Sequence, residues 1–370
     1  MQRRAEPDSV SSEAFPALVG QIREAIERAG GWIGFDRYMA LALYAPGLGY
    51  YANPSRKFGA LPGSDFVTAP ELTPLFGRAL ARQLAQALAA CGGDEVFEFG
   101  AGTGALAGQL LEALGGALRR YSIVEVSGSL RARQRERLAA HGDRVRWLDA
   151  WPEAMHGVAI GNEVLDAMPV QLLHWDGERW FERGVALGEA GADFRWSDRA
   201  TALRPPLEVA FIPGTTLELH AQAEAFVASL GERLARGAAF FIDYGFPAAE
   251  YYHPQRSGGT LMCHREHRAD TDPLADAGRK DITAHVDFTG IALAAQDAGF
   301  EVLGYTSQAR FLMNCGLLDD LAGADARAVA NAQKLLNEHE MGELFKVIGL
   351  ARGCEFEARG FTAGDRTHTL

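Results

Sequence analysis

The first ninety residues carry apolar positions at helical spacing. Ile22, Ile26 and Ala29 predict one amphipathic helix, and a short helix from Phe35 is expected to break at Pro46. Leucines at every fourth position over residues 80–88 predict a third helix. The stretch before it, residues 58–77, is rich in Gly, Pro, Ser and Thr but holds three phenylalanines, so we expect this loop to pack over another part of the molecule.

From about Glu95 the pattern changes to short apolar strands that alternate with helices. This alternation predicts a parallel, doubly wound α/β sheet. Asp176-Gly177 between two apolar runs predicts a hairpin with a type I′ turn, and residues 176–218 read as an irregular insertion. The predicted strands of the sheet cover residues 96–99, 121–126, 144–148, 157–164, 238–245, 300–307 and 344–353.

These patterns suggest three parts of the chain. They are an N-terminal helical region and lid (1–90), a sheet domain (91–175 and 236–353), and insertions that form a smaller accessory region (176–235 and 246–285).

Composition narrows the class of protein. The 370 residues are 48% hydrophobic and carry a net charge of -12, which disfavours nucleic acid as a partner and favours a basic one. Four widely spaced cysteines indicate neither a disulfide framework nor a zinc ribbon. We find no signal peptide and no apolar run long enough to span a membrane, and the Ala, Gly and Arg content is typical of GC-rich bacterial DNA, so a bacterial, cytoplasmic protein is expected.

Three glycines lie on the bend after the first strand of the sheet, in the stretch EVFEFGAGTGALAG. Gly100 and Gly102 fit the dinucleotide pattern G-x-G-x-x-A, and with Gly104 they equally fit E-x-G-x-G-x-G, which is typical of S-adenosylmethionine sites. The charge of Glu98 suits a cationic ligand better than a pyrophosphate, whereas Glu125 at the end of the next strand could bind ribose hydroxyls in either case.

Several longer motifs carry a family resemblance. They are GSDFVTAPELTPLFG, GNEVLDAMPV, DYGFPAAEYYHPQRSGGTLMCHREH, DITAHVDF and SQARFLMNCG. With them the chain resembles, from about residue 34 to 353, the MidA family of S-adenosylmethionine-dependent methyltransferases, whose mitochondrial members help to assemble respiratory complex I. Gly161, Ser307 and an inserted Ser64 depart from the family's motifs and leave only local contacts in doubt.

The resemblance implies a Rossmann-like, seven-stranded class I methyltransferase sheet with a late antiparallel strand, and it implies S-adenosyl-L-methionine as cofactor. Glu98 and the glycines would hold the methionine end, Glu125 the ribose, and the residues after the third strand the adenine. The loop up to Glu71 would close over the cofactor. The expected cofactor-binding residues are Asp65, Phe66, Thr68, Pro70, Glu71, Glu98, Gly100, Gly102, Gly104, Glu125, Val126, Leu148, Asp149, Ala150 and Asn162.

The expected catalytic residues follow the fourth and fifth strands, where open sheets bind ligands. Asn162, Glu163 and Asp166 should face the transferred methyl group, although they could instead only cap the next helix. Asp243 and His285 are further candidates, each with an equally plausible structural role. The resemblance implies that the acceptor is an arginine of a protein, such as a complex I subunit, which becomes symmetrically dimethylated.

Other functions stay open at this point. The chain could methylate a small molecule, act as a non-catalytic assembly factor that binds the cofactor, or be a nicotinamide dehydrogenase. The CHREH segment from Cys263 to His267 suggests zinc, but its spacing does not provide a tetrahedral site and we expect no metal. A homodimer is a further expectation.

Overall fold

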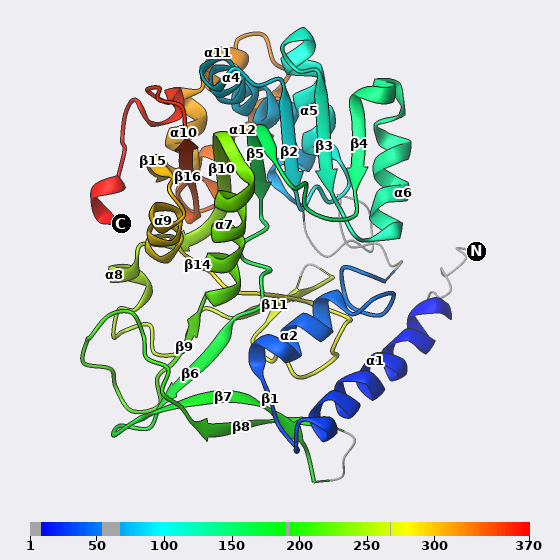
Figure 1. The fold of residues 1–370 in the computed structure, drawn as a ribbon, viewed down its shortest axis with the longest axis vertical. Coiled ribbons are helices and arrows are strands. Elements are labelled where there is room, and N and C mark those ends of the chain that lie inside the picture. The colour runs from blue at the N-terminus through cyan, green and yellow to red at the C-terminus, as the bar shows by residue number, and fades with distance from the viewer. Residues whose placement is uncertain (1–8, 54–66, 190–192, 267) are drawn as a thin grey trace. The chain divides into compact units, whose positions relative to one another are not determined.

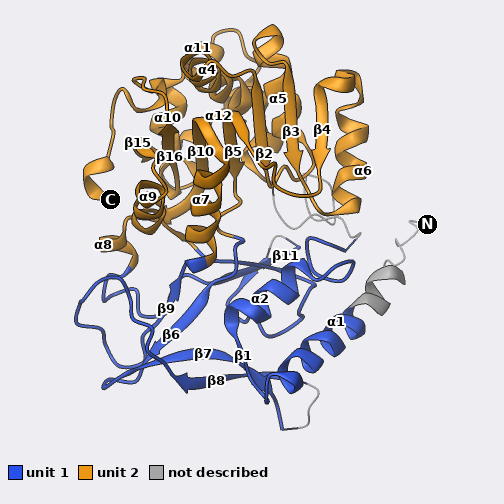
Figure 2. Ribbon diagram, in the orientation of Figure 1, with its two compact units in different colours: residues 1–66, 167–221, 252–284 blue, residues 67–166, 222–251, 285–370 orange. Residues whose placement is uncertain are grey.

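The computed structural model of the protein describes residues 9–53, 67–189, 193–266 and 268–370 (Figure 1). The chain divides into two compact units, each built from three separate segments (Figure 2). Unit 1 takes its described residues from 1–66, 167–221 and 252–284, and unit 2 from 67–166, 222–251 and 285–370.

Unit 2 is built on one large sheet. Its strands run in the order β15-β16-β10-β5-β2-β3-β4, and β14 adds a short pairing to β10. The neighbours from β10 to β4 pair in parallel, whereas β16 is antiparallel to both β10 and β15. The predicted seven-stranded sheet with a late antiparallel strand is therefore confirmed. The strands are β2 (Glu95–Phe99), β3 (Arg120–Val124), β4 (Val145–Leu148), β5 (Met155–Asn162), β10 (Leu234–Phe246), β14 (Val286–Asp287), β15 (Glu301–Ser307) and β16 (Phe345–Arg352).

Helices cover both faces of this sheet, which explains why its strands are apolar without alternation. On one face, α4 and α5 pack in a single cluster with Ile160 and Ile242 of the central strands. On the other face, Phe226 of α7 contacts the rings of Phe99 and Phe241, with centroids 5.1 and 5.8 Å apart. The helices of unit 2 are α3 (Ala69–Leu72), α4 (Pro74–Cys91), α5 (Ala105–Leu114), α6 (Gly128–Arg137), α7 (Ala221–Arg233), α8 (Ala248–Tyr251), α9 (Phe288–Asp297), α10 (Gln308–Asn314), α11 (Leu317–Asp320), α12 (Ala326–Leu336) and α13 (Met341–Leu344), and short 3₁₀ turns cover Gly115–Ala117, Ala139–Arg144, Arg359–Phe361 and Thr367–Thr369.

Unit 1 combines a five-stranded antiparallel sheet, a three-stranded sheet and two helices. Apolar side chains of α1 and α2 pack in one cluster with those of the strands, Val185 and Ile282 among them. Its elements are α1 (Ser9–Arg28), α2 (Phe35–Tyr44), β1 (Ile33–Gly34), β6 (Gln171–Trp175), β7 (Trp180–Leu187), β8 (Phe194–Ala200), β9 (Thr216–Leu219), β11 (Met262–Arg265), β12 (Arg268–Asp270) and β13 (Asp281–Thr283).

The predicted hairpin exists, but its turn differs from the expected type. Trp175 pairs with Trp180, and of the residues between them only Gly177 has a positive φ, at 110°. A type I′ turn needs positive φ at both central residues, so that part of the prediction is wrong. Instead, the Asp176 carboxylate accepts hydrogen bonds from the backbone N–H groups of Glu178 and Arg179, both at 2.8 Å.

The expectation of an irregular stretch over residues 176–218 is also wrong for two segments. β8 and β9 pair with β7 and β6 and complete the antiparallel sheet. β8 is a partly exposed edge strand with four charged or hydroxylic residues among seven. Its apolar alternation is confined to Phe194 and Trp196, which is too short to identify a strand.

Candidate active site

The glycine-rich turn joins β2 to α5 at the edge of the sheet where the parallel strands end, which we call the carboxyl edge. Gly100, Gly102 and Gly104 have φ values of 67°, 51° and 81°. A Cβ atom on Gly100 would lie 3.1 Å from the Val164 side chain, so the left-handed backbone and the close packing both require glycine there. The turn leads directly into the N-terminus of α5, whose first backbone N–H groups have no partner within the helix.

Glu98 lies beneath this turn in β2. Its side chain is buried, and Oε2 accepts a hydrogen bond of 2.8 Å from the Tyr121 hydroxyl. Burial raises the pKa of Glu98 to about 8; the Tyr121 hydrogen bond opposes this increase and the nearby Glu125 adds to it. Without a ligand the group is therefore mainly neutral at pH 7, and a cation brought next to it would favour its ionised form.

Glu125 follows β3 at the same edge. Its two carboxylate oxygens accept hydrogen bonds from the Ser127 backbone at 2.8 Å and the Gln134 side chain at 3.3 Å. Burial raises the pKa of Glu125, and these hydrogen bonds oppose the increase. The neighbouring Val126 is 79% exposed, an unusual exposure for a valine beside a buried carboxylate, and it offers an apolar surface at the end of the strand.

The end of β4 joins this group. The Glu125 backbone N–H donates to the carbonyl of Leu148 at 3.1 Å, and Asp149 pairs with Arg131 at 2.6 Å. Arg131 also donates to the Glu125 carbonyl at 2.7 Å, so Glu125, Leu148 and Asp149 are held together, with Ala150 next in the chain. Arg131 and Gln134 were not recognised from the sequence, where they read only as polar positions of a helix.

The expected lid is described from residue 67 onward; Asp65 and Phe66 lie outside the described residues. Glu71 in α3 accepts hydrogen bonds from Thr103 of the glycine turn and from Arg137 of α6, the latter at 2.8 Å. These bonds lower the pKa of Glu71 against the effect of burial. The Pro70 carbonyl accepts from Gln109 of α5 at 2.7 Å, and Thr68 precedes α3 as its N-cap residue. The segment Thr68–Glu71 is thus attached to the glycine turn, through partners that the sequence pattern did not reveal.

Carboxylates gather where β5 and β10 end. Glu163 directly follows β5 and has a left-handed backbone with φ of 54°, one of three non-glycine residues with positive φ among the described residues. Such a conformation is unfavourable by roughly 1–3 kcal/mol and is typical of functional sites. Its Oε1 accepts a hydrogen bond of 2.9 Å from Asn162 Nδ2, which fixes the carboxylate at the edge.

Asp243 holds this turn in place. One carboxylate oxygen accepts from the backbone N–H groups of Val164, Leu165 and Asp166, at 2.9–3.2 Å, and the other from the N–H of Tyr244 at 3.0 Å. Burial and the neighbouring carboxylates of Asp166 and Glu163 raise the pKa of Asp243, while the backbone hydrogen bonds lower it. Because its side chain is fully buried and both oxygens bind backbone, Asp243 is a positioning residue.

His285 lies beside the end of β10. Its ring contacts Tyr244 edge-on at 5.1 Å and stacks on Phe246 at 5.3 Å. Asp287, two residues further on, caps α9 by accepting from the backbone N–H groups of Thr289 and Gly290.

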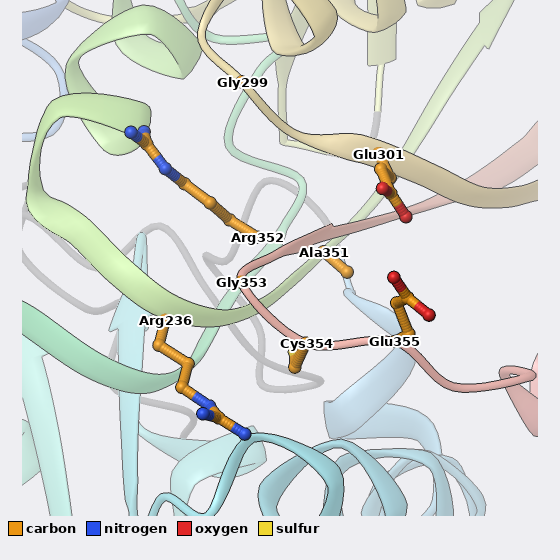
Figure 3. A pocket seen from close by; sticks show the side chains of 8 residues that line it. All are labelled: Arg236, Gly299, Glu301, Ala351, Arg352, Gly353, Cys354 and Glu355. Carbon is orange, nitrogen blue, oxygen red and sulfur yellow. The ribbon is translucent and has the colours of Figure 1, made fainter.

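A pocket of about 470 Å³ lies at the opposite, amino edge of the sheet (Figure 3). It is far along β10 from Asp243, since Arg236 at the start of that strand lines it. Among the described residues no three His, Cys, Asp or Glu side chains are arranged to bind a metal ion; His267 lies outside them. No helix in the described ranges is both long enough and apolar enough to cross a bilayer.

The residues at the carboxyl edge fit S-adenosylmethionine. Glu98 can balance a cationic group, Glu125 still has lone pairs for hydroxyl donors, and Val126 offers an apolar contact. Asn162 Oδ1 is buried and accepts no hydrogen bond from any described residue. It lies beside the glycine turn, because Phe99 pairs with Gly161 one position earlier. This sheet order and this turn define a class I methyltransferase.

Comparison with known proteins leads to the particular family. Residues 79–306 match the S-adenosyl-L-methionine-dependent methyltransferase family, and the chain belongs to that family, in a MidA-type branch. Over 88% of this chain and 85% of the relative, it is 28% identical to the mitochondrial protein arginine methyltransferase NDUFAF7 of Danio rerio. With the NDUFAF7 homolog of Caenorhabditis elegans it shares 27% identity over 78% of this chain and 74% of the relative.

Two crystal structures from Burkholderia thailandensis are similar over the whole length of both chains. One, with S-adenosyl-homocysteine bound, is 51% identical with a TM-score of 0.94. The other, a native structure, is 50% identical with a TM-score of 0.90. The chain is thus a methyltransferase that uses S-adenosylmethionine.

Proposed function

We propose that this methyltransferase transfers the methyl group to an arginine side chain of a protein. The observation that carries the proposal is the Glu163 carboxylate at the carboxyl edge, which is held in a strained backbone conformation. This carboxylate would repel an anionic acceptor and attract a cationic one.

The charge of arginine explains why a carboxylate is needed next to the acceptor. The guanidinium keeps its proton up to a pKa above about 12, so the acceptor nitrogen arrives within a delocalised cation. A carboxylate binds this cation with strong, directional hydrogen bonds and localises its charge away from the reacting nitrogen. S-Adenosylmethionine supplies the electrophilic methyl group. Glu163 would orient the guanidinium, and Asn162 would fix the orientation of Glu163.

Positioning should contribute more than proton transfer. Correct placement of two reacting groups can supply about 7–11 kcal/mol, whereas a general base supplies a factor of ~10²–10⁴, or about 3–5 kcal/mol. Asp243 contributes to positioning. It accepts hydrogen bonds from the backbone of Val164, Leu165 and Asp166, and these bonds set the path of the turn that carries Glu163.

The cofactor would be held as the family resemblance implies. Glu98 and the glycine turn would bind the methionine end, Glu125 the ribose, and the residues after β4 the adenine. The hydrogen bonds of Glu71 to Thr103 and Arg137 would keep α3 next to the turn.

A protein acceptor is supported by the names of the relatives, which are protein arginine methyltransferases, and by the net charge of -12, which favours a basic partner segment. We extend the proposal to symmetric dimethylation of a respiratory complex I subunit, the expectation from the MidA resemblance.

The test is transfer of a labelled methyl group from the cofactor to a lysate of cells that lack this protein, followed by mass spectrometry of the labelled product. We expect a labelled protein whose peptide carries symmetric dimethylarginine. If only a small molecule carries the label, the acceptor is that small molecule and the proposed arginine acceptor is wrong. Tight binding of S-adenosyl-homocysteine without any transfer would instead indicate a non-catalytic assembly factor.

A further inference from the structure

Aromatic side chains gather next to the carboxylates of the carboxyl edge. Tyr244 makes edge-to-face contacts with His285 at 5.1 Å and with Phe345 at 5.3 Å. Phe246 stacks on His285 at 5.3 Å. Tyr244, Phe246 and His285 are each partly exposed. The four rings come from β10, from β16 and from the residue directly before β14, and both of these strands pair with β10. We refer to these four residues as the aromatic group.

Tyr244 lies on the same face of the sheet as Asn162. Ile242 pairs with Asn162 in neighbouring parallel strands, and Tyr244 follows Ile242 by two positions. Side chains two positions apart in a strand point to the same face. The Asn162 amide, the Glu163 carboxylate bonded to it and the Tyr244 ring therefore lie along one side of the edge.

One member of the aromatic group already contacts a cation from this chain. The Lys346 ammonium lies 5.9 Å from the centre of the Phe246 ring, and it is held by the carbonyl and carboxylate of Glu343. Burial lowers the pKa of Lys346, and Glu343 opposes this decrease. Phe246 thus contacts an internal cation. Tyr244 lies on β10, the strand paired with β5, and His285 contacts the Tyr244 ring.

We infer that Tyr244 and His285 form the wall of a guanidinium subsite, whose polar end is the Glu163 carboxylate; the inference rests on the proposed arginine acceptor. A guanidinium is planar and weakly hydrated, so it both stacks on aromatic rings and binds a carboxylate with two parallel hydrogen bonds. An ammonium lacks this planar, two-pronged geometry. The subsite therefore selects arginine over lysine.

Binding without turnover tests the subsite. The probe is a Gly-Arg-repeat peptide titrated into the complex of the full chain with S-adenosyl-homocysteine, with the matching Gly-Lys-repeat peptide as control. We expect the arginine peptide to bind more tightly than the lysine peptide. Tyr244→Leu should weaken arginine-peptide binding by about tenfold, and Tyr244→Phe by less than about twofold, because the ring rather than the hydroxyl contacts the cation. His285→Leu should weaken binding in the same direction.

A cooperative thermal unfolding transition and wild-type affinity for S-adenosyl-homocysteine show that a variant keeps its fold; a lower unfolding temperature alone is expected, because the variants remove ring contacts. Equal affinity of wild type and Tyr244→Leu for the arginine peptide would overturn the subsite, as would an equal loss in Tyr244→Phe and Tyr244→Leu. Should one of these variants fail to fold, the other and His285→Leu still decide the question. The two proposals can be distinguished. If arginine peptides bind selectively but the lysate assay yields no methylated arginine, the proposed function is wrong and the subsite is not.

Discussion

The two edges of the unit 2 sheet use the same kinds of residue for different purposes. At the carboxyl edge, glycines form an open turn with left-handed backbone, and the carboxylates of Glu98, Glu163 and Asp243 are buried or conformationally fixed. At the amino edge, Gly157 and Gly237 allow strands to approach, since a Cβ on either would lie 2.0–2.1 Å from a backbone oxygen of the neighbouring strand.

The charged residues differ in the same way. Arg352 at the amino edge donates to the backbone carbonyls of Gly231 and Ala298, so it satisfies the ends of helices. Glu301, which lines the pocket of Figure 3, is exposed. Arg236 and Arg352 line the hollow of about 470 Å³, while the strained backbone and the buried carboxylates lie at the other edge.

The largest expected effect is on turnover. Glu163→Gln should reduce methyl transfer at least about 100-fold, because an amide can neither localise the guanidinium charge nor accept a proton. Thermal unfolding should be unchanged. Glu301→Gln, the same substitution at the amino edge, is the matched control and should keep full activity. Full-rate methylation by Glu163→Gln would contradict the role of this carboxylate.

The next effect is on stability. Asp243→Ala removes the acceptor of three buried backbone N–H groups, and we expect the free energy of unfolding to fall by about 2–4 kcal/mol in urea titrations. Asp243→Asn keeps one acceptor oxygen and should lose less. If Asp243→Ala is as stable as the wild type, the turn after β5 does not depend on Asp243.

A smaller effect concerns pH. The pKa of Glu98 is about 8 in the free protein, so the group is largely protonated below that pH. The ammonium group of the bound ligand favours the ionised form of Glu98, hence binding releases a proton and affinity should rise as pH increases toward 8, then level off. Between pH 6 and 7 the rise should approach tenfold in the affinity for S-adenosyl-homocysteine, measured by calorimetry in buffers of different ionisation enthalpy.

The control for this pH dependence is Glu98→Gln, which should bind more weakly and without the slope. The same group predicts that the ligand-free protein loses stability as pH rises, since its folded pKa lies above the ordinary value of 4.5. This loss should extend from about pH 4.5 to 8 and be absent in Glu98→Gln. If the affinity of the wild type does not change with pH, the ionisation of Glu98 is not coupled to ligand binding.

The smallest expected effect is at the amino edge. Arg236→Ala alters the wall of the pocket, yet it should change cofactor affinity and methyl transfer by less than about twofold, because Arg236 is an exposed residue far along β10 from Asp243. A large loss of activity in this variant would give the pocket a role and would weaken the contrast between the two edges.

The sequence predicted the sheet well for a physical reason. Strands that are covered on both faces, such as β10 with its buried run Ala-Ala-Phe-Phe-Ile over residues 238–242, leave a continuous apolar signal between turns. β8 leaves no such signal because it is a polar edge strand, and it was therefore missed. The turn after Trp175 lies one residue later than the predicted Asp176-Gly177 turn. The Asp176 backbone N–H donates to the Arg179 carbonyl at 3.3 Å, so Gly177 and Glu178 are the central residues.

The candidate site was only partly accessible from the sequence. Glu163 could be suggested from its place after a buried strand, but its left-handed backbone depends on Asp243, which lies on a different strand, far away in the chain. The contact of Glu71 with Thr103 and Arg137 likewise joins three separate segments. No local pattern encodes such long-range hydrogen bonds, so positioning residues escape sequence reasoning even where the residues they position do not.

The positive φ of Glu163 has a consequence for engineering this enzyme. Glycine would adopt that backbone without strain, so a library screened only for heat resistance should accumulate the substitution Glu163→Gly, in variants that fold at least as well and lack the carboxylate proposed to orient the acceptor. Directed evolution for thermal stability would therefore have to select for turnover at the same time, or leave the codon for residue 163 out of the randomised positions.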